Sequence, residues 1–193
     1  MDAAGRVRAA MATQPRGRFL PRSERRRASY DGPLDIGHGQ TNSQPRTVRS
    51  MLELLDVLPG QRVLDVGSGS GWTTALLAVL VGPTGSVLGL ERVPDLVLTG
   101  GANVAAARMP WARVRASVAG VLGAPDEAPF DRVLVSAMAT VLPEPLVAQL
   151  DVSGILVVPV AGRMLRVERD PSAPDGRCVT EHGHYRFVPL ITD

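Results

Sequence analysis

The sequence predicts an α/β protein with a doubly wound, mostly parallel sheet and helices on both faces. Short apolar runs of strand length alternate with longer helical segments through the middle of the chain, as in sheets of this kind. The first of these runs leads into a glycine-rich turn, residues 67–71, at the start of a helix. Two alternating segments near the C-terminus predict an antiparallel hairpin that completes the sheet. A length of 193 residues fits a single domain, 1–193.

The N-terminal part, residues 1–46, is expected to be a helical lead-in followed by a loop. Residues 1–30 are polar and rich in arginine, and two prolines divide them. Residues 31–46 contain clustered glycine, proline and polar residues, so we expect no regular structure there. A helix with an apolar side follows at Thr47–Leu58, and Pro59-Gly60 stops it.

Strands and helices alternate from residue 62 onward. The expected strands are Arg62–Val66, Ser86–Leu90, Ala112–Ala116, Asp131–Ala137 and Gly154–Val160. The expected helices are Trp72–Val81, Leu96–Met109 with an interruption at Gly100-Gly101, and Pro143–Leu150. The C-terminal hairpin is expected to pair Arg163–Glu168 with Tyr185–Leu190 across a turn-rich segment, Asp170–Gly176.

Composition and charge are typical of a soluble enzyme or binding domain. Hydrophobic residues make up 45% and charged residues 21%, and the longest apolar stretch, Thr74–Gly82, is too short to cross a bilayer. Cys178 is a single cysteine, which excludes an internal disulfide and is typical of the cytoplasm. All basic residues are arginines, and the dense cluster Arg22–Arg27 is expected to be a solvated helix face. We expect a cytoplasmic monomer without a nucleic-acid or membrane partner.

The glycine-rich turn is the strongest local sign of a binding site. Glycines let a ligand approach the backbone, and free N–H groups at a helix start attract anions. The spacing Gly-x-Gly-x-Gly is shorter than the Gly-x-Gly-x-x-Gly of dinucleotide sites, which argues against an NAD dehydrogenase. The candidate residues of the turn are Gly67, Ser68, Gly69 and Gly71.

Two acids accompany this turn. Asp65 precedes it within the expected strand, and Glu91 follows Gly71 by twenty positions, at the end of the next strand. A carboxylate at that place can accept both hydroxyls of a ribose. An alternative is that both acids only cap neighbouring turns. The nucleoside-binding interpretation is favoured because both acids lie at strand ends beside the glycines.

The histidines do not form a metal-binding pattern. His38 is isolated, and His182 and His184 have no compact set of further ligands near them in the sequence. We therefore expect no metal site.

A longer motif carries a resemblance to a known family. An acid followed by Val-Gly-x-Gly-x-Gly, with a later ribose-binding acid, resembles the Rossmann-like S-adenosylmethionine methyltransferases in general. The segment Asp35–Pro45 is more specific, because it resembles the motif Pro-Ile-Gly-x-Gln-Thr-Ile-Ser-(Gln/Ala)-Pro of protein-L-isoaspartate O-methyltransferases. The resemblance extends over about Arg18–Ile191 and includes Arg18–Pro21, Tyr30-Asp31, Ala128–Asp131, Leu156–Val160 and Phe187–Leu190.

The resemblance implies a function and a set of site residues. It implies S-adenosylmethionine as cofactor, S-adenosylhomocysteine as product, and methylation of the free α-carboxylate of L-isoaspartyl residues in proteins or peptides. It implies that Ser43 lies at the active site, supported by Thr41, with the cofactor at Asp65, the glycine turn and Glu91. Little acid–base chemistry is needed, since the substrate carboxylate is already ionised at neutral pH.

Three departures from the family pattern bear on the site. The family usually carries Gly-Asp-Gly after the third strand, where the Asp contacts the adenine amino group. At the corresponding place this chain has Val118-Ala119-Gly120, so Ala119 replaces the Asp. Asn42 replaces the usual apolar residue beside Ser43, and Ala161-Gly162 replaces Val-Gly. Two alternatives therefore stay open: a carboxyl methyltransferase for one dedicated peptide or protein, and a cofactor-binding module with impaired catalysis.

Overall fold

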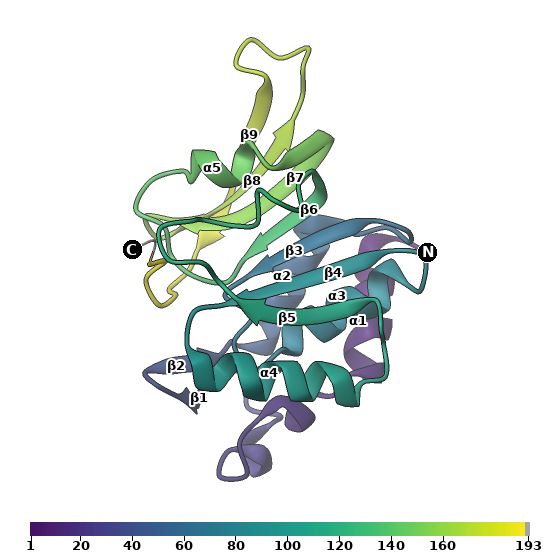
Figure 1. Cartoon of the computed structure of the whole chain (residues 1–193), viewed down its shortest axis with the longest axis vertical. Helices are drawn as coiled ribbons and strands as arrows, with labels where there is room; N and C mark the ends of the chain where they lie inside the picture. The colour runs from purple at the N-terminus through teal and green to yellow at the C-terminus, as the bar shows by residue number, and fades with distance from the viewer. Residues whose placement is uncertain (192–193) are drawn as a thin grey trace.

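A computed structural model describes residues 1–191 and shows a twisted sheet flanked by helices (Figure 1). Within these residues the main sheet has seven strands in the order β5-β4-β3-β6-β7-β8-β9. β3 to β7 are parallel, and β7, β8 and β9 pair in antiparallel fashion. The strands are β3 Arg62–Val66, β4 Ser86–Glu91, β5 Ala112–Ala116, β6 Phe130–Val135, β7 Leu150–Val160, β8 Arg163–Arg169 and β9 Arg177–His184. The predicted fold class and the antiparallel end of the sheet are confirmed.

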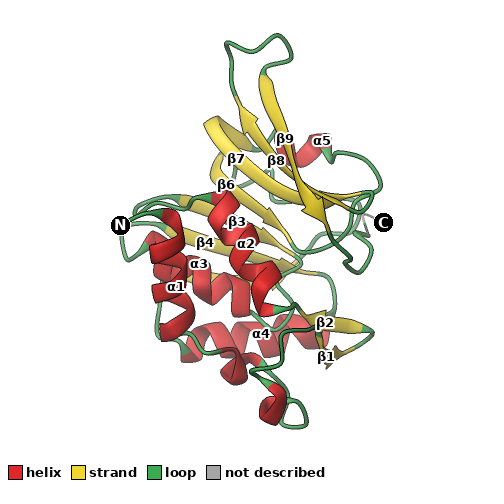
Figure 2. Ribbon diagram, turned by 180° about the vertical axis from the view of Figure 1, so that it is seen from behind, coloured by secondary structure: helices red, strands yellow, loops and turns green. Residues whose placement is uncertain are grey.

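Helices cover the two faces of the sheet unequally. The helices α1, α2 and α3 lie together on one face, with α4 beside α3 and β5, and the short α5 packs on β7 from the other side (Figure 2). Their bounds are α1 Ala3–Thr13, α2 Pro45–Leu55, α3 Trp72–Val81, α4 Pro94–Ala106 and α5 Glu144–Val147. No helix within residues 1–191 is long and apolar enough to cross a membrane.

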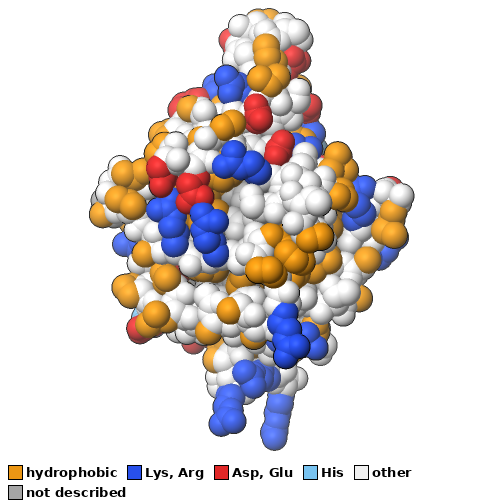
Figure 3. Space-filling model, turned by 45° about the vertical axis from the view of Figure 1, so that its right-hand side comes forward, with side chains coloured by type: hydrophobic (Ala, Val, Ile, Leu, Met, Phe, Trp, Pro, Cys, Tyr) orange, Lys and Arg blue, Asp and Glu red, His pale blue; other side chains and the backbone are white. Residues whose placement is uncertain are grey.

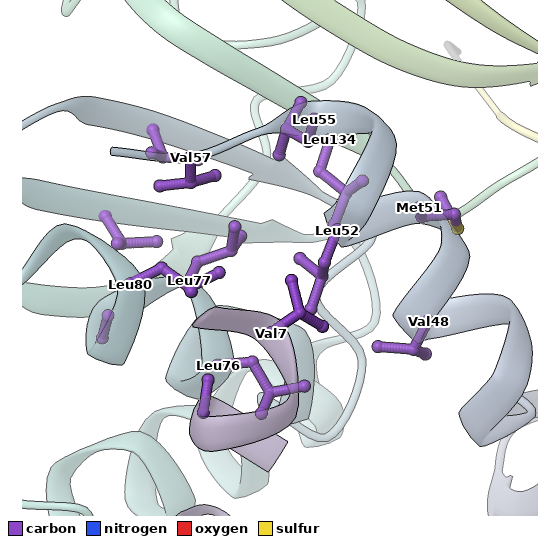
Figure 4. Packing of buried hydrophobic residues seen from close by; sticks show 14 of the residues in the cluster. Val7, Val48, Met51, Leu52, Leu55, Val57, Leu76, Leu77, Leu80 and Leu134 are labelled. Carbon is purple, nitrogen blue, oxygen red and sulfur yellow. The ribbon is translucent and has the colours of Figure 1, made fainter. Parts of the chain in front are cut away.

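Strand alternation divides the core into two layers. In β3, Val63 packs on the helical face, whereas Leu64 and Val66 pack on the opposite face. On the helical face, Figure 4 shows Val7 from α1 and Leu52 from α2 meeting side chains of α3 over the sheet. Each such buried side chain stabilises the fold by about 1.5–3 kcal/mol. Because α3 is enclosed by the sheet, α1 and α4, it is apolar on all sides.

Three expected elements have the observed bounds, namely Arg62–Val66, Trp72–Val81 and Ala112–Ala116. Each lies between residues that stop regular structure, so local sequence determines where it begins and ends. The dense arginine cluster is not a helix face, because Arg25–Arg27 forms a single exposed 3-10 turn, η2, after the 3-10 turn η1 at Arg16–Phe19. Basic side chains gather at the lower end of the molecule in Figure 3.

The expectation of a wholly irregular segment 31–46 was wrong. It contains an antiparallel pair, β1 Leu34–Gly37 and β2 Gln40–Asn42. His38 and Gly39 connect the strands with φ of 57° and 69°, as in a type I′ hairpin turn. The glycines that indicated a loop therefore make the turn of a hairpin.

The pairing of the C-terminal hairpin also differs from the prediction. β8 pairs with Arg177–His184, and Tyr185–Leu190 instead runs beside the end of β6. There the N–H of Met138 donates to the carbonyl of Val188, and the N–H of Leu190 donates to the carbonyl of Met138, at 2.7 and 2.8 Å. The more polar segment therefore forms β9 at the exposed edge of the sheet, while the apolar one packs at the end of the parallel strands.

The fourth helix continues through the glycine pair at which an interruption was expected. α4 is continuous across Gly100 and Gly101, and Gly100 faces the glycine turn at close range. A Cβ at Gly100 would lie 2.6 Å from the carbonyl oxygen of Gly69. Glycine is present at this position to let two backbones approach each other, and it does not end the helix.

Candidate active site

A cavity of about 270 Å³ lies at the carboxyl ends of β3, β4, β5 and β6. Ligands of open α/β sheets bind at this edge, where the chain order reverses between neighbouring strands. Its walls come from the turn after β3 with the start of α3, the β1–β2 hairpin with the start of α2, the ends of β4 and β6, the loop after β5, and the C-terminal stretch 188–191. The site therefore depends on segments from both ends of the chain.

The three glycines of the turn have positive φ but different surroundings. Gly67 and Gly69, with φ of 79° and 53°, line the cavity. Gly71, with φ of 84°, faces α4, where a Cβ would lie 2.8 Å from the carbonyl oxygen of Gly100. The first two glycines are thus available to a ligand, whereas Gly71 allows α3 and α4 to pack closely.

Glu91 is the last residue of β4 and lies on the cavity wall with 6% of its surface exposed. One carboxylate oxygen accepts from the N–H of Gly69 at 2.9 Å, and the other accepts from the N–H groups of Arg92 and Val93 at 2.8 and 2.9 Å. The carboxylate is therefore held by backbone amides beside the turn. A carboxylate has about four acceptor positions, so one remains for a ligand hydroxyl.

Asp65 lies beneath the glycine turn and is not part of the cavity wall. It is fully buried, and one carboxyl oxygen accepts from the hydroxyls of Thr73 and Thr74, both at 2.7 Å. The other oxygen has no hydrogen-bond partner among the residues that the structure describes. Burial raises the pKa of Asp65 to about 6, against the opposing effect of the two threonine hydroxyls. In this position Asp65 ties the first turn of α3 to β3.

The motif residues Thr41 and Ser43 both lie on the cavity wall, at the end of the β1–β2 hairpin. α2 begins two residues after Ser43, and its N-cap residue is Gln44, without a side-chain cap. Ser43 is therefore not the cap of this helix. At the tip of the hairpin, His38 contacts Asp95 in the first turn of α4 at 3.2 Å, so the hairpin folds over the glycine turn.

The loop after β5 brings Ala119 and Gly120 to the cavity, together with exposed Val118 and Val121. Ala119 supplies no side-chain acceptor on this wall. Ser68, from the glycine turn, also lines the cavity, and its hydroxyl is buried without a partner in the described part of the chain.

Two residues that the sequence did not single out as part of the site are central to its construction. Arg16 and Trp72 come from η1 and α3, and the guanidinium lies over the indole ring at 5.7 Å. Trp72 lines the cavity, and its indole N–H donates to the carbonyl of Gln14 at 2.9 Å. The only local signal in the sequence was an aromatic residue, Trp72, directly after the glycine turn. Within residues 1–191 no group of three or more histidine, cysteine or acidic side chains forms a metal site.

Comparison with known proteins agrees with this geometry. The family model of protein-L-isoaspartate(D-aspartate) O-methyltransferase matches residues 2–193. A protein-L-isoaspartate O-methyltransferase of Methanopyrus kandleri is 43% identical over 192 residues, which is 96% of this chain and 83% of the relative. That of Aeropyrum pernix is 44% identical over 194 residues, covering 96% and 72%.

Solved structures show the same likeness. A Plasmodium falciparum protein, described as a protein-L-isoaspartate O-methyltransferase and crystallised with S-adenosyl-L-homocysteine, superposes with a TM-score of 0.81 and 27% identity. The match covers 97% of this chain and 91% of that one. The fold is thus the Rossmann-like methyltransferase fold, and the chain belongs to the protein-L-isoaspartate(D-aspartate) O-methyltransferase family.

Proposed function

We propose that this chain transfers a methyl group from S-adenosylmethionine to the free α-carboxylate of L-isoaspartyl residues in damaged proteins or peptides, which starts repair through a succinimide. The observation that carries the proposal is that the motif residues Thr41 and Ser43 line the same cavity as Glu91 and the glycine turn. Membership of the family supports the same reaction.

The residues present fit the cofactor. Gly67 and Gly69 leave backbone open to a ligand, and Glu91 keeps an acceptor position beside them for the ribose. The buried hydroxyl of Ser68 has no partner among residues 1–191, which fits a site completed by a ligand. In this proposal neither Asp65 nor Gly71 touches the cofactor. Asp65 supports the glycine turn from beneath by holding the first turn of α3, and Gly71 supports it by letting α3 and α4 pack closely. When bound, the cofactor supplies an activated methyl group on a sulfonium.

The chain's own contribution is binding and orientation. The substrate carboxylate is ionised at neutral pH, so no side chain has to remove a proton from it. In our proposal the Ser43 hydroxyl donates a hydrogen bond to this carboxylate, worth about 1.5–3 kcal/mol with a charged acceptor, and Thr41 supports the loop. Correct placement of two reactants can contribute roughly 7–11 kcal/mol to lowering the barrier.

A peptide panel tests the proposal. The purified protein is incubated with labelled S-adenosylmethionine and three matched peptides: one isoaspartyl, one aspartyl, and one isoaspartyl with its α-carboxylate blocked as an amide. We expect methylation of the first peptide only. Equal methylation of the aspartyl peptide would contradict the proposed specificity. Cofactor binding by calorimetry without turnover on any isoaspartyl peptide would contradict the repair activity itself.

We also propose that the protein acts as a cytoplasmic monomer on protein or peptide substrates, without a nucleic-acid or membrane partner. The exposed free thiol of Cys178 is compatible with a reducing compartment. Light scattering after gel filtration tests the monomer: a mass near 20.4 kDa is expected, and twice that mass would refute it.

A further inference from the structure

A buried arginine connects the N-terminal segment to residues 40–44, the part of the chain that carries Thr41 and Ser43 and is called the motif loop below. Arg16 lies in η1, 26 residues before Asn42, and only 5% of its surface is exposed. Its guanidinium donates to five oxygen atoms: the carbonyls of Tyr30, Gly32, Asn42 and Ser43 at 2.8–2.9 Å, and the side chain of Asn42 at 2.7 Å. Two of these bonds hold the peptide groups on either side of Ser43.

Asn42 passes this connection on to the glycine turn. Its side chain is buried, with the oxygen bound to Arg16 and the nitrogen donating to the hydroxyl of Ser70 at 3.0 Å. The carbonyl of Ser70 in turn accepts from the side chain of Asn103 in α4 at 2.9 Å. A continuous chain of hydrogen bonds thus runs from η1 through the motif loop to the glycine turn and α4.

The chemistry of this contact requires a guanidinium. All five acceptors of Arg16 are neutral oxygens, so the loop is held by the number and direction of the hydrogen bonds and not by an ion pair. Burial lowers the pKa of Arg16, with the charge of Asp31 acting in the opposite direction. A lysine has a single ammonium with three donors and does not reproduce the planar arrangement. An apolar residue at position 42 would leave the Nε of Arg16 and the hydroxyl of Ser70 without a partner.

We propose that Arg16 and Asn42 are positioning residues for methyl transfer, which hold Ser43 at a fixed place relative to the glycine turn. The inference rests on the proposed function, because it assigns these residues to the same reaction. It also gives a physical reason for a buried polar side chain beside the serine. A displacement of about 1 Å at a reacting group can cost on the order of 100-fold in rate.

Two variants and a matched control test the inference. Asn42→Leu removes both side-chain bonds at similar size, and Arg16→Lys removes the planar donor set. Arg132→Lys is the control, because Arg132 is also buried but bonds the carbonyls of Asp56 and Asp131, away from the cavity. We expect both test variants to lower kcat on an isoaspartyl peptide about ten-fold, with KM for S-adenosylmethionine within about three-fold of wild type. The control keeps the wild-type kcat at equal fraction folded.

A second readout separates positioning from activity. Amide hydrogen exchange of residues 40–44, measured by mass spectrometry on the folded protein, should be at least ten-fold faster in Asn42→Leu and unchanged in Arg132→Lys. Wild-type kcat in Asn42→Leu, or an equal loss of kcat in the control, would overturn the inference. If the wild-type protein methylates no isoaspartyl peptide, the proposed function fails. The exchange rates then still decide whether Arg16 and Asn42 order the loop.

Discussion

The buried carboxyl of Asp65 makes the stability of the protein depend on pH in an unusual direction. Its pKa is raised by burial from 3.8 to about 6. Between these values the folded protein binds more protons than the unfolded chain, so the free energy of unfolding falls as the pH rises. The cost of ionising Asp65 is absent below about pH 3.8 and complete above about pH 6. A pKa shift of this size lowers the free energy of unfolding by something on the order of 3 kcal/mol once Asp65 is ionised.

The test is the isosteric substitution Asp65→Asn, which removes the ionisation. The amide oxygen can still accept from Thr73 and Thr74, and the amide nitrogen replaces an oxygen that already has no partner. Urea unfolding of both proteins at pH 4.5 to 8 measures the difference in free energy. We expect the variant to gain stability relative to wild type as the pH rises, by about 2 of the roughly 3 kcal/mol over this range, with most of the change between pH 4.5 and 6. A difference that does not vary with pH, or that varies in the opposite direction, would refute the reasoning.

Three further predictions concern ligands and catalysis. Ser43→Ala should lower kcat with an isoaspartyl peptide by roughly ten- to a hundred-fold, as expected for one lost charged hydrogen bond, with a rate that stays flat from about pH 6 to 8; wild-type kcat in steady-state assays would contradict this. Glu91→Ala should weaken binding of S-adenosylhomocysteine by about 1–3 kcal/mol in calorimetry, since the ribose loses its acceptor, and unchanged affinity would remove Glu91 from the site. Ala119→Asp should tighten that binding by up to about 1–2 kcal/mol if the adenine amino group gains an acceptor; weaker binding would show that another group already has this role.

Much of the sheet and the glycine turn can be predicted from sequence because the determining residues are local. The strand Arg62–Val66, the turn after it and the helix Trp72–Val81 form one continuous pattern. Apolar periodicity specifies the elements, and glycine specifies the backbone between them. Glu91 follows by the same logic, because it ends the next strand and parallel strands end at one edge.

The tertiary structure decides which distant segments pack against each of these local elements. Gly67 and Gly71 belong to the same glycine pattern in the sequence. In the fold, α4 packs against Gly71, whereas Gly67 lines the cavity. The pairing of β9 was likewise missed, because the segment 185–190 alternates as a strand does, and only its packing beside the end of β6 shows that it does not pair with β8.

Arg16 is the clearest case of a residue that only the fold explains. In the sequence it is one of many arginines near the N-terminus, and its acceptors are mostly backbone carbonyls, which carry no residue-specific signal. Hydrogen bonds across 14 to 27 residues leave no periodicity to read. The sequence by itself determined the parallel strands of the sheet, and it determined the glycine turn and the motif residues that line the cavity. The burial of one guanidinium against residues 30–32, residues 42–43 and Trp72 was decided by tertiary structure, because desolvation and bond direction exist only after the chain has folded.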